Sequence, residues 1–292
     1  MPLSLRGLCP TLKYIVLSYP EDLAMFLNLL HGLAANLRFS NGPWIIYQRI
    51  FHRCAREVTY IWQNRLRIVC DCATKDHLAL REIFCWEVYA PWLPSGRLPS
   101  GQIRYVNVGS HIGAFDLWIR EQGLVIENSL AAELNPETCR RGRRNLEANG
   151  LNGVCVVNCG VAAEAGFVDF VPSGNSLVDG IFPHGDGPAA GARSQRIELI
   201  SLPAFLRQHA GNQDEFDLLK LDCEGAEYGI LRVTPLAELR RFRHIIVEFH
   251  PEPAGESVRA AYQRLREAGF ASRRGAPGSL IFLDLFSRDT PA

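Results

Sequence analysis

Short apolar runs alternate with helical patterns from residue 101 to the end of the chain. The runs IRYVNVG, LAAEL, GVCVVNCG, FDLLKLD and HIIVEFH are typical of buried strands. Between them, helical spacing covers residues 114–122, 136–149, 203–210, 226–231 with a continuation towards residue 241, and 257–268. This alternation predicts an α/β domain whose parallel sheet is covered by helices. The tail, with GFASRR, GAPG and SLIFLDLF, predicts an antiparallel hairpin that closes the sheet.

The first hundred residues follow a different, mixed pattern. Helices are predicted over residues 21–38 and within DHLALREIFCWEVYAPWL, and a hairpin over EVTYIWQNRLRIVCD, although its QN turn contains no glycine. PWLPSGRLPSG then interrupts every pattern, so we expect an N-terminal α+β extension over residues 1–100 and a main domain over residues 101–292. A low-complexity patch at residues 185–194 predicts a mobile loop.

Composition excludes several classes of protein. Lys plus Arg equal Asp plus Glu at 31 each, so no overall field attracts nucleic acid or an anionic membrane. The early stretch LAMFLNLLHGLAANL is too short and too polar to span a bilayer, and no signal-peptide pattern precedes it. Nine cysteines without a CxxC pair favour free thiols over disulfides or zinc. We therefore expect a cytoplasmic protein that does not bind nucleic acid and has no transmembrane segment.

Notable residues follow the predicted strands. Ligands of open parallel sheets bind at the carboxyl ends of the strands. After the first strand, Gly109 and Gly113 let backbone amides and a helix N-terminus approach a ligand. Glu133 follows the second strand, where a carboxylate accepts ribose hydroxyls, and Gly160 follows the third, where it permits close packing of a flat base. In this order the residues predict a site for an adenosine-containing cofactor.

The glycine turn narrows the choice of cofactor. The dinucleotide fingerprint GxGxxG needs a middle glycine, which the GSHIG turn lacks. A pyrophosphate is therefore disfavoured, and an amino-acid tail fits better, as in S-adenosylmethionine. A nicotinamide-dependent oxidoreductase is the alternative.

Acidic residues gather at the fourth and fifth strand ends. FDLLKLDCEGAEYGIL places Asp222, Glu224 and Glu227 around one turn, although acids at a helix start are also favoured by its dipole. In VEFHP, strand alternation points Glu248 and His250 to the same face, where a buried pair would be ordinary by itself. Beside a cofactor pocket, we interpret these acids as functional.

These segments resemble the FkbM family of S-adenosylmethionine-dependent methyltransferases. The resemblance covers about residues 80–286 and rests on YVNVGSHIGAF, ELNPETCRRGRRNLEANGL, VVNCGVA, FDLLKLDCEGAEYGIL and IIVEFHP, of which LKLDCEGAE is the most specific. It implies a Rossmann-like, seven-stranded methyltransferase fold whose last strand is antiparallel. It also implies O-methylation of a hydroxyl on a small metabolite, such as a sugar or a polyketide.

The resemblance implies a role for each matching residue. Gly109 and Gly113 would flank the methionine part of the cofactor, and Glu133 would hold the ribose. Asp222 would lie nearest the reactive methyl group. The adenine would lie among Leu134, Cys159, Gly160 and Val161.

Three further positions matter to the resemblance: Asn107, Asn175 and Ser176. The family usually has Asp where this chain has Asn107, which supplies no charge for the methionine ammonium, so weaker cofactor binding is predicted. Asn175 and Ser176 would touch the substrate at the pocket mouth, with a solvated turn as the alternative.

Methylation of a hydroxyl requires removal of its proton. Asp222, Glu224 and His250 are the available groups, and His250 is the expected base because its unperturbed pKa lies nearest neutrality. Alternatively, a divalent metal such as Mg²⁺ on Asp222, Glu224 and Glu248 would lower the pKa of the hydroxyl.

A non-catalytic scaffold on a degenerate methyltransferase fold is the remaining alternative. Asn107 would be its sign, but the intact DCEGAE and EFHP segments argue against it. The extension, with Trp44, Trp62, Trp86 and Trp92, would cap the pocket or form a homo-oligomer contact.

Overall fold

The computed structural model describes residues 30–51, 56–93, 101–173, 175–181, 193–211, 213–274 and 281–288. Residues 30–37 are helical, which agrees with the end of the first predicted helix; its beginning lies outside the described residues. So does most of the loop predicted at residues 185–194.

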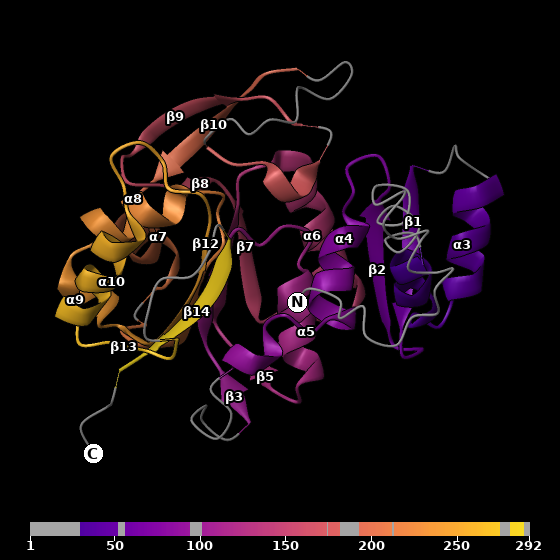
Figure 1. The fold of residues 1–292 in the computed structure, drawn as a ribbon, viewed down its shortest axis with the longest axis horizontal. Helices are drawn as coiled ribbons and strands as arrows, with labels where there is room; N and C mark the ends of the chain where they lie inside the picture. The colour runs from indigo at the N-terminus through magenta and orange to yellow at the C-terminus, as the bar shows by residue number, and fades with distance from the viewer. Residues whose placement is uncertain are drawn as a thin grey trace, which may run out of the picture.

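A seven-stranded sheet forms the centre of the molecule (Figure 1). Its order is β13-β14-β12-β11-β4-β6-β7, and β14 alone runs antiparallel to its neighbours in this sheet. This confirms the predicted fold and its antiparallel last strand. The strands are β4 (Tyr105–Val108), β6 (Ser129–Glu133), β7 (Val154–Asn158), β11 (Phe216–Leu221), β12 (Phe242–Phe249), β13 (Ala271–Ser272) and β14 (Phe282–Ser287).

Helices cover both faces of this sheet. In Figure 1, α7, α8 and α10 lie on one side, and α5 and α6 on the other. The helices are α5 (Ala114–Glu121), α6 (Pro136–Ala148), α7 (Leu202–His209), α8 (Ala226–Val233), α9 (Leu236–Leu239) and α10 (Val258–Glu267). The expected continuation of the 226–231 helix is interrupted because Pro235 holds Thr234 in an extended conformation, so α9 is a separate helix.

The extension contains the predicted hairpin, β1 (Glu57–Trp62) and β2 (Leu66–Asp71), beside α3 (Gly42–Phe51). Gln63 and Asn64 have φ values of 47° and 58°, so the turn adopts the left-handed conformation that tight hairpins require even without glycine. The second helix predicted there is broken into three short pieces: α4 (His77–Leu80), the π-helix η1 (Arg81–Cys85) and the 3₁₀ helix η2 (Ala90–Trp92).

Small elements around the main sheet were not predicted. A three-stranded sheet contains β8 (Gly160–Val161), β9 (Gly166–Phe170) and β10 (Gln195–Ile200), β3 (Gln102–Ile103) pairs with β5 (Val125–Ile126), and η3 (Ser176–Val178) is a 3₁₀ turn. The two-residue strands β3, β5 and β8 are too short to show a period of two.

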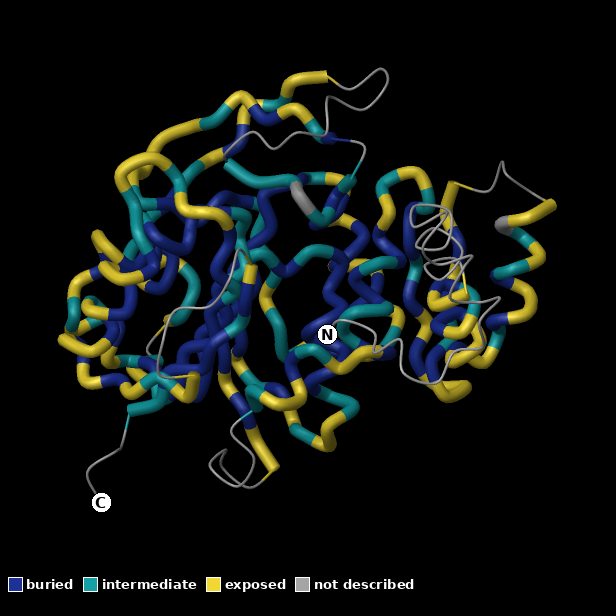
Figure 2. Tube along the Cα trace, viewed as in Figure 1, coloured by how far each residue is buried: buried dark blue, intermediate teal, exposed yellow. Residues whose placement is uncertain are grey.

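The extension and the main domain share one hydrophobic core. Phe39, Tyr60 and Phe84 of the extension belong to the same buried cluster as Phe115 and Leu218, and Figure 2 shows buried segments continuing from the central strands towards the hairpin. The domain boundary expected near residue 101 therefore stays a prediction, because residues on both sides of it pack into the same hydrophobic cluster.

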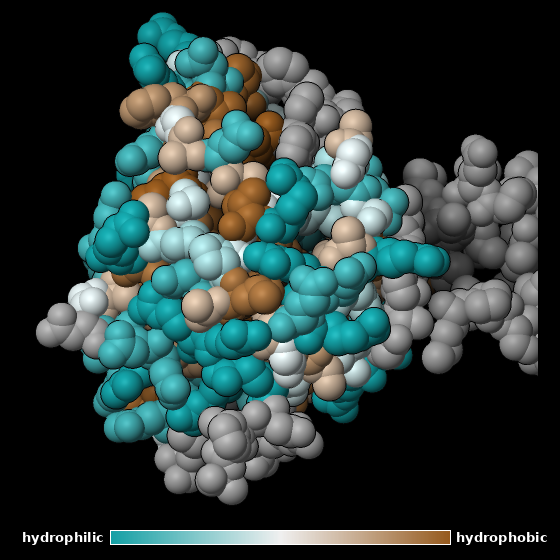
Figure 3. All heavy atoms as spheres, turned by 90° about the vertical axis from the view of Figure 1, so that its left-hand side faces the viewer, coloured by the Kyte–Doolittle hydropathy of each residue, from teal (hydrophilic) through white to brown (hydrophobic). Residues whose placement is uncertain are grey.

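Polar residues cover the outer helices. On the face seen in Figure 3, hydrophilic residues predominate and apolar ones are interspersed among them. Within the part of the chain that the structure describes, no helix is long and apolar enough to cross a membrane, and no disulfide joins the cysteines found there to one another.

Candidate active site

A cavity of about 610 Å³ opens at the carboxyl ends of the central strands. Parallel strands end at the same edge, so the residues that follow β4, β6, β11 and β12 converge there. Most of the predicted site residues line it: Gly109, Glu133, Leu134, Cys159, Gly160, Val161, Asn175, Ser176, Asp222, Glu224, Glu248 and His250. Asn107 and Gly113 do not.

The two glycines of the turn have different tasks. Gly109 has a φ of 80°, and a Cβ there would lie 1.7 Å from the carbonyl oxygen of Asp222, so the turns after β4 and β11 approach closely only without a side chain. Gly113, with a φ of 77°, begins α5, and a Cβ there would lie 3.0 Å from Leu146 of α6. Gly113 thus serves helix packing behind the cavity wall.

Asn107 lies behind the turn. Its side chain is fully buried, and its amide nitrogen donates to both carboxylate oxygens of Asp116, at 3.3 and 3.1 Å. Burial raises the pKa of Asp116, which also accepts a hydrogen bond from the Tyr105 hydroxyl. Because Asn107 does not line the cavity, a direct contact of its side chain with a cofactor would require the turn to rearrange.

Glu133 is held by backbone amides. Its two carboxylate oxygens accept from the N–H groups of His111 at 2.8 Å and Asn135 at 2.9 Å. Burial raises the pKa of Glu133 to about 7, although these hydrogen bonds oppose the change. Each oxygen retains a lone pair for a further donor from the cavity.

Four carboxylates line the opposite side of the cavity, and we call them the acidic wall: Glu82, Asp222, Glu224 and Glu248. The Tyr89 hydroxyl lies 3.0 Å from Asp222 Oδ2 and 3.2 Å from Glu248 Oε2. Burial and the charge of Asp222 raise the pKa of Glu248 to about 8. Burial and the charges of Asp222 and Glu224 raise the pKa of Glu82 to about 7.

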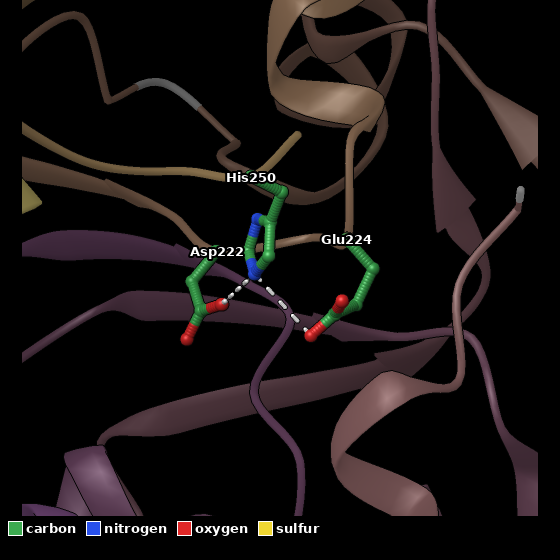
Figure 4. Close-up of side chains that lie close together, drawn as sticks. All are labelled: Asp222, Glu224 and His250. Carbon is green, nitrogen blue, oxygen red and sulfur yellow. Dashed lines mark ion pairs between the residues drawn. The ribbon is translucent and has the colours of Figure 1, made fainter. Parts of the chain in front are cut away.

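His250 points its ring between two carboxylates of this wall (Figure 4). Its Nε2 lies 3.3 Å from Glu224 and 3.8 Å from Asp222, and its Nδ1 lies 3.2 Å from Glu227. Although burial lowers the pKa of His250, hydrogen bonds to Glu224 and Glu227 and the charge of Asp222 raise it to about 11. A pKa raised in this direction argues against the expected role of His250 as the base, which stays a prediction.

A second group of charges lies where the extension meets the glycine turn, and we call it the extension cluster. Arg141 of α6 is buried and pairs with Asp76 at 2.8 Å and with Asp71 at 3.7 Å. Asp76 accepts from Ser176 at 2.6 Å, and Ser176 lies 2.8 Å from Nε2 of His111. Ser176 is thus buried in this network rather than in a solvated turn.

Asn175 begins the short helix η3. Its side-chain oxygen accepts from the backbone of Leu177. Asn175 and Ser176 both line the cavity. Each also makes a hydrogen bond within the protein that holds this segment in place.

Several residues of the site were not found from sequence. Glu82 and Tyr89 reach the cavity from the extension, and no pattern near them marks this role. Trp86, one of the tryptophans expected to cap the pocket, also lines the cavity. Lys220 could have been noticed, because it is the one charged residue in the interior of the apolar run LLKLD. Its ammonium donates to Asp222 at 3.0 Å and to the carbonyl of Gly109 at 3.2 Å, and so links the two turns.

A family model and several known proteins are similar to this chain. The family model described as "Methyltransferase FkbM domain" matches residues 107–272, more than half of the chain. The methyltransferase sdnD of Sordaria araneosa is 29% identical over 203 residues, which cover 60% of this chain and 74% of that protein.

Solved structures of methyltransferases also match. An FkbM methyltransferase from Methylobacillus flagellatus KT is 14% identical with a TM-score of 0.44, over 76% of this chain and 56% of that one. The METTL16 methyltransferase domain is 14% identical with a TM-score of 0.39, over 72% of this chain and 67% of that one. On the match of the family model, this chain belongs to the FkbM methyltransferase family.

Proposed function

We propose that this protein transfers a methyl group from S-adenosylmethionine to a hydroxyl oxygen of a small metabolite in the cytoplasm. Family membership implies the methyl donor. The observation that best supports a small acceptor is the cavity of about 610 Å³, which lies within the range of about 300–1,000 Å³ for small-ligand sites. One side of this cavity is lined by residues suited to bind a nucleoside, and the acidic wall lines the other side.

The residues present fit the cofactor. We assign the ribose to Glu133, because its carboxylate has acceptor capacity left after binding two amides. We assign the adenine to the surface of Leu134, Cys159, Gly160 and Val161, and the methionine part to the turn at Gly109. When bound, S-adenosylmethionine supplies an electrophilic methyl group. Asn107 acts indirectly, by holding Asp116 behind the turn.

The acidic wall would orient the acceptor hydroxyl and receive its proton. A cationic His250 cannot receive it, so we assign this role to Glu248, which lines the cavity beside Asp222. The pKa of Glu248 is raised to about 8, so the carboxylate form that accepts a proton becomes the main form above this pH. The Tyr89 hydroxyl, which also donates to Asp222, holds Glu248 in position.

A divalent ion is a second means of lowering the pKa of the hydroxyl. The convergence of Asp222, Glu224 and His250 supports this possibility. The nicotinamide alternative is disfavoured by membership in a methyltransferase family.

Calorimetric titration with S-adenosylmethionine and, separately, NAD tests the cofactor. We expect micromolar binding of S-adenosylmethionine alone. Gly109→Ala should weaken it at least 100-fold, because the new Cβ forces the two turns apart. Gly123→Ala is the matched control, since Gly123 has nearly the same φ, 81°, but open space around it. No binding by the natural protein would favour the scaffold alternative.

The acceptor is tested by a panel of hydroxylated metabolites with detection of S-adenosylhomocysteine and of the methylated product. We expect an O-methyl product. A product methylated only on nitrogen or carbon would contradict the proposed reaction while leaving the cofactor assignment intact.

A further inference from the structure

Three potential metal ligands converge at the cavity. Asp222 and Glu224 follow β11, and His250 follows β12, which is its parallel neighbour. One ligand atom from each lies within 4.8 Å of the others. Figure 4 shows the ring nitrogen of His250 directed between the two carboxylates. These atoms thus surround a space at the cavity wall that a single ion would fill.

His250 is oriented in the manner of a metal ligand. Its side chain is 5% exposed, and the fully buried Glu227 accepts from its backbone N–H at 2.9 Å and lies 3.2 Å from Nδ1. Glu227 is itself fixed by the backbone N–H of Gly225 at 2.9 Å. Histidines that bind metals commonly donate their other ring nitrogen to a carboxylate, which directs Nε2 at the ion.

The charge of the wall provides an independent argument for a cationic ligand. The four carboxyl groups of the wall line the same part of the cavity as the cationic side chain of Lys220 and the ring of His250. Lys220 is already shared between Asp222 and a backbone carbonyl. Carboxylates so crowded are stabilised by a positive charge placed between them.

We propose that Asp222, Glu224 and His250 bind one divalent first-row transition-metal ion, for which Mn²⁺ is the probe. The proposal rests on the proposed function, in which the ion would orient the acceptor hydroxyl and lower its pKa. Two carboxylates favour hard ions, whereas an imidazole nitrogen favours transition metals over Mg²⁺.

The structure also changes the expected ligand set. The sequence indicated Glu248 as the third ligand, but Glu248 is not among the residues whose ligand atoms converge. The three atoms that converge include His250 instead.

The test is Mn²⁺ binding by the full chain after removal of metals with EDTA, followed by calorimetry and electron paramagnetic resonance. We expect one Mn²⁺ per chain, with a pulsed-resonance signal from the nitrogen of His250. Glu224→Gln should weaken Mn²⁺ binding at least 10-fold. Glu238→Gln, on α9 and paired with Arg241, is the matched control and should leave it unchanged.

Three results would overturn the proposal: no Mn²⁺ binding by the natural protein, unchanged affinity in folded Glu224→Gln, or bound Mn²⁺ without a nitrogen signal. The nitrogen signal is measured on the natural protein and does not depend on any variant folding. S-adenosylmethionine binding measured in EDTA reports on the proposed function separately, so failure of the metal site and failure of the methyltransferase assignment are distinguishable.

Discussion

Two groups of buried charges flank the cavity, and they differ in balance. In the extension cluster, Asp71 and Asp76 are matched by the buried Arg141 and by Arg56, which pairs with Asp71 at 2.9 Å. In the acidic wall, the described carboxylates outnumber the cations around them. Both groups contain the same kinds of side chain and both involve the extension.

The difference indicates different tasks. A balanced, buried ion pair loses stability when one partner is removed, because the other charge is left without compensation. Crowded carboxylates instead raise one another's pKa, as at Glu82 and Glu248, and are relieved by losing a charge or gaining a cation. We infer that the extension cluster holds the fold together, whereas the acidic wall is arranged for a ligand.

Removal of Arg141 should have the largest effect. Arg141→Met leaves Asp76 buried without its cation and should lower the free energy of unfolding by about 3–5 kcal/mol. Urea unfolding measures this. Arg144→Met, on the same helix but with a side chain 45% exposed and paired with Glu57, should cost about 1 kcal/mol or less. Equal losses in the two variants would contradict the structural role of the extension cluster.

Neutralising a carboxylate should lower the free energy of unfolding in the extension cluster and raise it in the acidic wall. In the extension cluster, Asp76→Asn weakens the pairing with Arg141 and should lower the free energy of unfolding by about 2–3 kcal/mol at pH 8. The pKa of Asp76 supports this direction: burial would raise it, but His111, Arg141 and Ser176 lower it below its ordinary value. A variant as stable as the natural protein would show that Asp76 is not held by its partners.

The same change in the acidic wall should stabilise the metal-free protein. The pKa of Glu82 is about 7 in the fold against an ordinary value of 4.5, so between these values the unfolded chain releases a proton that the fold retains. Stability therefore falls as pH rises through this range, and Glu82→Gln removes the loss. We expect a gain of about 1 kcal/mol at pH 8, after allowance for solvent screening, and none at pH 4.5. If Glu82→Gln instead lowers the free energy of unfolding at pH 8, as Asp76→Asn is expected to do, the proposed difference between the two groups is wrong.

The smallest effect concerns His111, between the two groups. Burial lowers its pKa below 6.5, although Asp76 opposes this. As pH falls below 6.5, the unfolded chain binds a proton that the fold does not, so stability decreases, by at most about 1.4 kcal/mol per pH unit for one proton. Urea midpoints at pH 7.5 and 5.5 should show this loss, and His111→Gln should reduce it. His209→Gln is the control for removal of a histidine, and an equal reduction there would refute the assignment to His111.

Much of the site could be predicted from local sequence. Apolar runs specify buried parallel strands, and such strands end at one edge, so Glu133, Gly160, Asp222 and His250 were expected to meet before any contact was known. The cavity confirms that these residues share one edge. Gly109 was recognisable for the same reason, because a strand followed by a glycine and a helix defines a tight turn.

What each side chain does at that edge was decided only by tertiary structure. Tyr89 meets Asp222 across 133 residues of sequence, and Glu82 reaches the wall from a π-helix that no periodicity marks. The pKa of His250 is raised because three carboxylates surround its ring. The Asn107 amide donates to Asp116 because that carboxylate is buried beside it. Sequence patterns specify which face of an element is buried, but pKa values and hydrogen-bond partners depend on charges brought together by packing of distant segments.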